Sequence, residues 1–157
     1  MTTHKEFLTK AFNEAYWGIR NELGGPFGAV VVKDGLIIGK GCNRVIVDND
    51  PTAHAEVTAI RQACRQIGSY DLSGAVIYAT CEPCPMCLSA IYWAKISFVY
   101  FSLTQYDAAG IGFSDHHIYQ ELKLPAEERL LKMEKIEHPL SEMLFCEWNN
   151  NPSRILY

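Results

Sequence analysis

Two stretches decide how this chain is interpreted: His54-Ala55-Glu56 and, thirty residues further on, Pro83-Cys84-Pro85-Met86-Cys87. One imidazole and two thiolates supply three of the four ligands of a tetrahedral zinc ion, so the fourth position stays open for water. An open position is typical of catalytic zinc, because structural sites usually close all four positions with protein ligands. Glu56 is a poor fourth ligand in a Cys-rich site but is well placed to move protons. The sequence therefore predicts one catalytic Zn²⁺ per chain, held by His54, Cys84 and Cys87, with Glu56 as the catalytic acid and base.

Cys81 offers a competing choice of ligand, because Cys81 and Cys84 also form a C-x-x-C pair. Cys81 precedes Pro83 at the end of an expected strand, whereas Cys84 and Cys87 share one helical turn. Unpaired backbone N–H groups at a helix start stabilise thiolates. These arguments favour Cys84 with Cys87. A redox role for a lone C-x-x-C pair remains the simpler alternative, but it leaves the H-x-E stretch unexplained.

The rest of the chain alternates strand and helix patterns. Apolar spacing predicts helices, and short β-rich runs bounded by turn residues predict strands. Asp34-Gly35 is a strong hairpin signal. The expected helices cover residues 7–22, 53–67, 84–95 and 139–148, with short ones near 107, at 115–122 and after 125. The expected strands cover residues 27–32, 36–41, 75–80, 96–101 and 132–136. This order predicts an α/β fold with one mixed sheet and helices on both faces, in a single domain over residues 1–157.

Composition limits the classes of partner. The chain has 157 residues, 48% of them hydrophobic, and a net charge of -4 with scattered basic residues. Nucleic-acid binders usually carry a basic excess, so a small molecule is the expected partner rather than a nucleic acid. No apolar run approaches the ~20 residues of a membrane span. The N-terminus lacks a secretory pattern and thiolate ligands must stay reduced, which favours the cytoplasm.

The two stretches and their surroundings resemble the cytidine deaminase superfamily and, within it, the small bacterial guanine deaminases. The H-x-E and P-C-x-x-C signature is shared by zinc-dependent base deaminases. The resemblance spans essentially the whole chain and extends to segments outside the zinc motifs. These are Gly24-Gly25-Pro26-Phe27-Gly28-Ala29-Val30, Asn49 to Arg61, Ala90 to Ala94, Asp107-Ala108-Ala109, Gly112-Phe113-Ser114-Asp115 and Ile118-Tyr119. The resemblance implies a three-layer α/β/α fold with a mixed five-stranded central sheet.

The resemblance also implies an activity, the hydrolysis of guanine to xanthine and ammonia. It implies substrate-binding roles for Asn43, Phe27, Asp115, Trp93, Ala55 and Tyr157. Asn43 would hydrogen-bond the base edge, Phe27 would stack on the ring, and Asp115 would accept from guanine N–H groups. Guanine deaminases of this type further suggest a homodimer with exchanged C-terminal segments.

Some alternatives stay open at this point. The zinc signature does not choose a base, so guanosine, cytosine or tRNA adenosine are alternative substrates. Ser114-Asp115, Gly110 and the His116-His117 pair depart from related sequences, which leaves base specificity and a pocket role for the two histidines open. A structural zinc module for protein binding is the non-enzyme alternative, and it would have no use for Glu56.

Overall fold

The computed structural model describes residues 3–157. Its internal contacts divide the chain into two compact units, Met1–His117 and Ile118–Tyr157. The single domain predicted from the sequence stays a prediction. Within residues 3–157, no helix is both long and apolar enough to cross a membrane.

The first unit is built on a mixed sheet with the strand order β2-β1-β3-β4. β1 (Gly28–Lys33) pairs antiparallel with β2 (Leu36–Cys42) and β3 (Val76–Cys81), and β3 pairs parallel with β4 (Phe98–Leu103). The β1–β2 turn is the predicted hairpin at Asp34-Gly35, and both residues have positive φ, 51° and 76°. This is the conformation that a two-residue turn between twisted strands requires.

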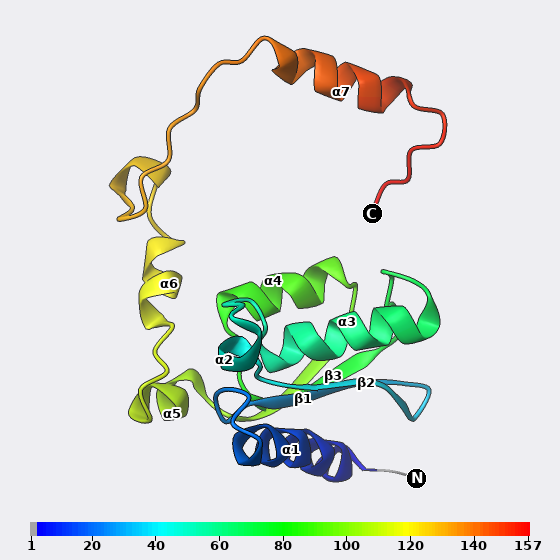
Figure 1. Cartoon of the computed structure of the whole chain (residues 1–157), viewed down its shortest axis with the longest axis vertical. Helices are drawn as coiled ribbons and strands as arrows, with labels where there is room; N and C mark the ends of the chain where they lie inside the picture. Colours follow the sequence, from blue (N-terminus) through cyan, green and yellow to red (C-terminus); the bar gives the residue numbers. More distant parts are fainter. Residues whose placement is uncertain (1–2) are drawn as a thin grey trace. The chain divides into compact units, whose positions relative to one another are not determined.

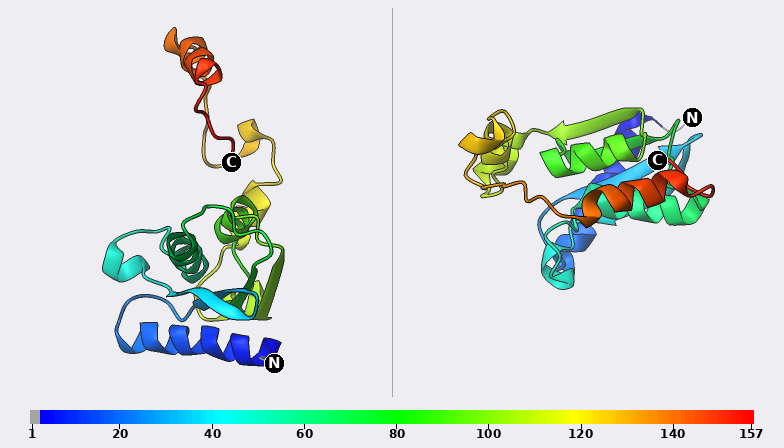
Figure 2. Two further views of the ribbon diagram at one scale, coloured as in Figure 1. Left: turned by 90° about the vertical axis from the view of Figure 1, so that its right-hand side faces the viewer. Right: turned by 90° about the horizontal axis from the view of Figure 1, so that it is seen from above.

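Helices cover both faces of this sheet, as Figures 1 and 2 show. α1 (His4–Arg20) lies on one face, where Phe7 and Ala11 pack with Val30, Val32 and Tyr78. α3 (Ala55–Ile67) and α4 (Pro85–Trp93) lie on the other face. The predicted three-layer α/β/α architecture is therefore confirmed. α2 (Val45–Asp48) and α5 (Gln105–Gly110) are short helices outside these layers.

α3 packs very closely on β2 because two glycines face it. A Cβ at Gly39 would overlap the main chain of Ala59, and a Cβ at Gly41 would lie 2.7 Å from the carbonyl oxygen of Ala55. Bare backbone at these positions sets the depth at which the first turn of α3 rests on the sheet. That turn carries the H-x-E stretch.

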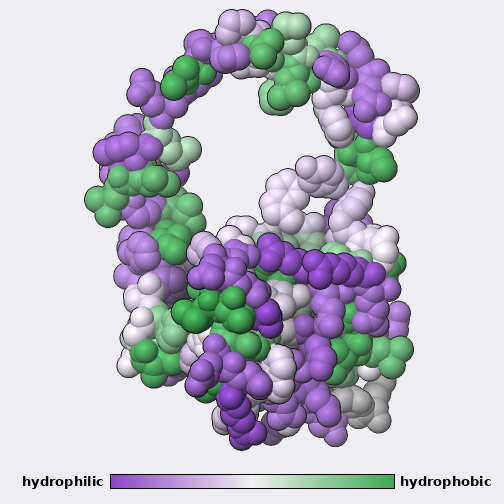
Figure 3. All heavy atoms as spheres, in the orientation of Figure 1, coloured by the Kyte–Doolittle hydropathy of each residue, from purple (hydrophilic) through white to green (hydrophobic). Residues whose placement is uncertain are grey.

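The second unit contains the end of α6 (His116–Glu121), the 3₁₀ helix η1 (Ala126–Glu128) and α7 (Leu140–Asn150). The strand predicted at residues 132–136 is wrong for this structure: that segment has no regular secondary structure, and the sheet of the described chain has four strands, not five. A strand needs a neighbouring strand for its backbone hydrogen bonds, and residues 118–157 contain none. Apolar side chains of α7, including Phe145 and Leu144, are exposed in this unit (Figure 3).

Candidate active site

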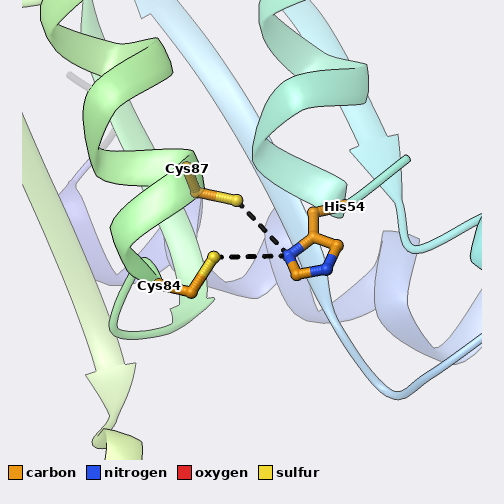
Figure 4. A group of neighbouring side chains, drawn as sticks. All are labelled: His54, Cys84 and Cys87. Carbon is orange, nitrogen blue, oxygen red and sulfur yellow. Dashed lines mark hydrogen bonds between the residues drawn. The ribbon is translucent and has the colours of Figure 1, made fainter. Parts of the chain in front are cut away.

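The predicted metal ligands lie at the starts of two helices. His54 is the N-cap residue of α3, Cys84 is the N-cap residue of α4, and Cys87 lies in the first turn of α4. Pro85 occupies the first turn of α4, where its missing N–H costs no hydrogen bond. Figure 4 shows the two thiols from α4 pointing at the imidazole from α3.

The distances among these three side chains fit a tetrahedral zinc ion. His54 Nδ1 lies 3.5 Å from Cys84 Sγ and 3.5 Å from Cys87 Sγ. All three ligand atoms lie within 4.8 Å of one another. Zinc bonds of about 2.3 Å to sulfur and about 2.0–2.1 Å to nitrogen, at tetrahedral angles, separate N and S by about 3.5 Å. The three side chains are thus already spaced as ligands of one ion.

The electrostatics of the cluster favour a thiolate. A hydrogen bond from the Cys87 thiol and, to a smaller extent, the His54 ring together lower the pKa of Cys84 to about 4. The same contact raises the pKa of Cys87, and contact with Cys84 raises that of His54. Cys81 lies outside the cluster: its Sγ donates to the carbonyl oxygen of Thr104 at 3.4 Å. Burial raises the pKa of Cys81 to about 11, so this residue stays a neutral thiol.

Glu56 lies directly beside the ligands, on the first turn of α3. Its side chain is only 7% exposed, and Oε2 lies 3.5 Å from Cys87 Sγ. Burial raises the pKa of this carboxyl above its ordinary value. A carboxyl group shifted toward neutral pH can both accept and return a proton, which is what acid–base catalysis needs. Ala55, between His54 and Glu56, is fully buried as the first residue of the helix.

Asn43 and Phe27 lie next to each other where β2 ends and β1 begins. Asn43 N–H donates to the Phe27 carbonyl oxygen at 3.0 Å. Asn43 Oδ1 accepts from Gly25 N and from Val45 N, both at 3.2 Å. These two donors fix the orientation of the amide, because Oδ1 must face them. The Asn43 side chain therefore has Nδ2 left to offer a ligand, and it is a donor only.

The other predicted substrate-binding residues differ in how close the structure places them to the metal ligands. Asp115 lies close enough to Cys84 for its pKa to be raised by that charge, although burial raises it more. His116 lowers the pKa of Asp115, and both His116 and His117 are exposed. Trp93 ends α4, and the residue is 66% exposed. Tyr157 belongs to the second unit.

Phe113 is an aromatic residue whose role the sequence did not single out. Its ring meets that of Phe27 edge to face, with centroids 5.1 Å apart and an interplanar angle of 89°. The only signal in the sequence is its place in the segment that resembles the purine pocket of related enzymes. The first unit thus brings together a ligand triad, a buried carboxyl group, an oriented amide and an aromatic pair.

Comparison with known proteins defines the class. Residues 1–103, more than half of the chain, match the family described as the cytidine and deoxycytidylate deaminase zinc-binding region. The chain belongs to this family of zinc-dependent deaminases. Zinc is accordingly the metal that the His54, Cys84 and Cys87 group fits.

More specific similarity follows within the family. The chain is 50% identical over 149 residues to guanine deaminase of Bacillus subtilis (strain 168), which covers 94% of each protein. The X-ray structure of guanine deaminase from Bacillus subtilis matches with a TM-score of 0.95 at 47% identity, over 99% of each chain. A tRNA-specific adenosine deaminase of Haemophilus influenzae is 42% identical over 100 residues, 63% of this chain and 57% of that protein. The similarity to guanine deaminase therefore spans nearly the whole chain, including the second unit, whereas that to the tRNA enzyme spans 63% of it.

Proposed function

We propose that this protein deaminates guanine hydrolytically at C2, which gives xanthine and ammonia. The observation that carries the proposal is the 50% identity to a guanine deaminase over 94% of the chain. The site supports it independently, because a zinc ligand triad stands beside a buried carboxyl group. In this reaction one water is consumed, a C–N bond breaks at C2, and a C–O bond forms there.

Zinc, when bound, supplies a Lewis acid that lowers the pKa of water from 15.7 to about 7. The protein's own contribution is proton transfer by Glu56. Glu56 takes a proton from the attacking water and delivers it to a ring nitrogen, which makes C2 more electrophilic. It then carries a second proton to the amino group, so that ammonia leaves rather than an amide ion. Such acid–base catalysis typically contributes about 10²–10⁴-fold.

Recognition of the base rests on the groups around this cluster. Asn43 Nδ2 donates to an acceptor on the purine edge, since Asn43 Oδ1 is held by the main chain. Phe27 provides a face on which the ring stacks, and Asp115 accepts from guanine N–H groups. Ala55 begins α3, so its N–H has no partner within the helix and can donate to the substrate.

The function is tested by measuring ammonia release from guanine, guanosine, adenine, cytosine and a tRNA anticodon stem with zinc-loaded protein. Release from guanine alone, with xanthine as product, supports the proposal. Release from another base or from tRNA would overturn it and move the error to substrate recognition. No release from any of the five would overturn the guanine assignment as well.

We also propose a homodimer in which the two copies exchange their C-terminal segments, with Trp93 and Tyr157 closing the substrate site. Support comes from apolar surface in each unit: Phe98, Phe101 and Leu103 are exposed on edge strand β4, and α7 exposes its apolar residues. Residues 132–136, predicted as a strand, have no regular secondary structure and no strand to pair with in the second unit. A segment from a second copy would give β4 a partner and the sheet a fifth strand.

Reduced thiolate ligands suit the cytoplasm as the location of this protein.

A complementation experiment tests the exchange. One copy carries Glu56→Ala with an intact C-terminus, and the other keeps Glu56 but lacks residues 153–157. Each is expected to be inactive alone, and both are denatured together and refolded as a mixture. Exchanged tails restore activity in the mixed dimer, because the intact tail then reaches the intact carboxyl group. An inactive mixture, or a mass of 17.7 kDa in solution, would contradict the exchanged dimer.

A further inference from the structure

Gly24 lies against the side chain of Asn43. A Cβ on Gly24 would overlap Asn43 Oδ1 and would lie 2.8 Å from the Asn43 carbonyl oxygen. Real Cβ atoms are essentially never found so close to other heavy atoms, so a larger residue would displace the amide. The φ angle of Gly24 is not positive, so backbone conformation does not require glycine here. Glycine is required here because there is no room for a side chain beside Asn43.

Gly25 also contacts Asn43, and it lies against the rings of Phe27 and Phe113. Its N–H donates to Asn43 Oδ1 at 3.2 Å, which fixes the amide from the main-chain side. A Cβ on Gly25 would lie 3.0 Å from Phe113 Cζ and 3.2 Å from Phe27 Cδ2. The φ angle of Gly25 is not positive either. A Cβ on Gly25 would therefore press on the edge-to-face pair of Phe27 and Phe113, and the rings would have to shift by a few tenths of an ångström.

We infer that Gly24 and Gly25 are positioning residues for recognition of the purine, which rests on the function proposed above. The bare main chain at these two positions holds Asn43 with Nδ2 as its ligand-facing group and holds the Phe27 and Phe113 rings in contact. Neither glycine touches the substrate itself. Their effect passes through the amide donor and the stacking face.

Gly24→Ala tests the route through Asn43 in a double-mutant cycle with Asn43→Asp. Aspartate keeps the Oδ1 acceptor for Gly25 and Val45 but removes the Nδ2 donor. We expect Gly24→Ala to lower kcat/KM for guanine at least tenfold in the wild-type background, mainly through KM. In the Asn43→Asp background the further loss caused by Gly24→Ala should be under threefold. The Nδ2 donor that Gly24→Ala would displace is already absent in that background. An equal loss in both backgrounds would overturn the inference.

Val30→Ala provides the matched control for lost stability. Val30 is buried against α1, on the face of the sheet opposite α3 and α4. We expect this variant to lower Tm while keeping kcat/KM, which shows what destabilisation alone does. Gly25→Ala should raise KM while the zinc content stays near one per chain. A loss of zinc in either glycine variant would overturn a role confined to base recognition.

A second readout does not depend on the identity of the substrate. In a ¹H–¹⁵N spectrum, the Asn43 side-chain NH₂ pair is identified by its absence in Asn43→Asp. Gly24→Ala should shift this pair, and Val30→Ala should leave it in place. An unmoved pair in Gly24→Ala would overturn the inference even if guanine is the substrate. A shifted pair in a protein that does not release ammonia from guanine would uphold the positioning and reject the proposed function.

Discussion

Replacing Asn43 by aspartate separates the structural role of this side chain from its role in recognition. The wild-type Oδ1 accepts from Gly25 N and Val45 N at 3.2 Å each, and the residue is only 5% exposed. A carboxylate oxygen can accept both hydrogen bonds, and charge-assisted bonds of this kind are stronger than neutral ones. Alanine at the same position removes the acceptor altogether and leaves two partly buried N–H groups without a partner.

The two variants should therefore differ in stability, although both lose the Nδ2 donor. Each unsatisfied N–H costs about 1–3 kcal/mol, so Asn43→Ala should lose about 2–6 kcal/mol of folding free energy. Asn43→Asp should lose about 1 kcal/mol or less, because its charge-assisted bonds offset most of the cost of burying the charge. For recognition, aspartate loses a hydrogen bond of about 0.5–1.5 kcal/mol and sets an acceptor against the substrate's acceptor, at about 1–3 kcal/mol or more. A total of about 1.5–4.5 kcal/mol lowers kcat/KM by about 10- to 2,000-fold.

Thermal unfolding and steady-state kinetics measure the two effects on the same preparations. Asn43→Ala should melt at least about 8 °C below the wild type, at about 4 °C per kcal/mol for a unit of this size. Asn43→Asp should melt within a few degrees of the wild type and yet lose at least about tenfold in kcat/KM for guanine. Equal melting temperatures for the two variants would refute the fixed orientation of the amide. An Asn43→Asp enzyme with kcat/KM within threefold of wild type would refute its role as donor.

Further predictions concern the metal, the proton carrier and pH. Glu56→Gln should keep zinc near one per chain and lose about 10²–10⁴-fold or more in kcat; substantial turnover would remove the proton-transfer role. Cys81→Ser should keep its zinc, measured by atomic emission, whereas Cys84→Ser should lose it; loss in both variants would place Cys81 among the ligands. Hydrogen bonds from Ser73 hold the pKa of Asp71 well below its ordinary value. Asp71 therefore stabilises the fold above the pKa of the unfolded carboxyl, about 3.9, and this contribution disappears as pH falls through the lower folded pKa. Asp71→Asn should accordingly lower Tm at pH 7 but not in strong acid, and an equal difference at both pH values would contradict the assignment.

The parts of the site that depend on short-range pattern could be predicted from the sequence. H-x-E and C-x-x-C each lie within one helical turn, and the helix start signals place both pairs at N-termini. The sequence predicted that His54, Cys84 and Cys87 converge, and the structure places their ligand atoms within 4.8 Å. The Asp34-Gly35 hairpin could also be predicted, because two residues decide the turn type.

Features that depend on distant partners could not be predicted. Residues 132–136 were predicted as a strand, but a strand forms only where a neighbouring edge accepts its hydrogen bonds. The orientation of Asn43 depends on the N–H of Gly25, eighteen residues away. From the sequence alone, Asn43 was expected to hydrogen-bond the base edge, with no choice made between donor and acceptor. Phe113 was missed as a separate residue for the same reason, because its contact with Phe27 spans most of the first unit.

Topology explains why such distant residues nevertheless meet at one edge of the sheet. β1 runs antiparallel to β2 and β3, so the start of β1 lies beside the ends of both: Gly28 pairs with Cys42, and Ala29 pairs with Ala79. Phe27 precedes β1 and Asn43 follows β2, and α4 begins shortly after β3 ends. Base-contacting groups and thiolates therefore arrive at the same edge whenever the strands pair in this order. The opposite edge, which carries the Asp34-Gly35 turn, holds none of these groups, so substitutions there should change stability without changing the choice of base.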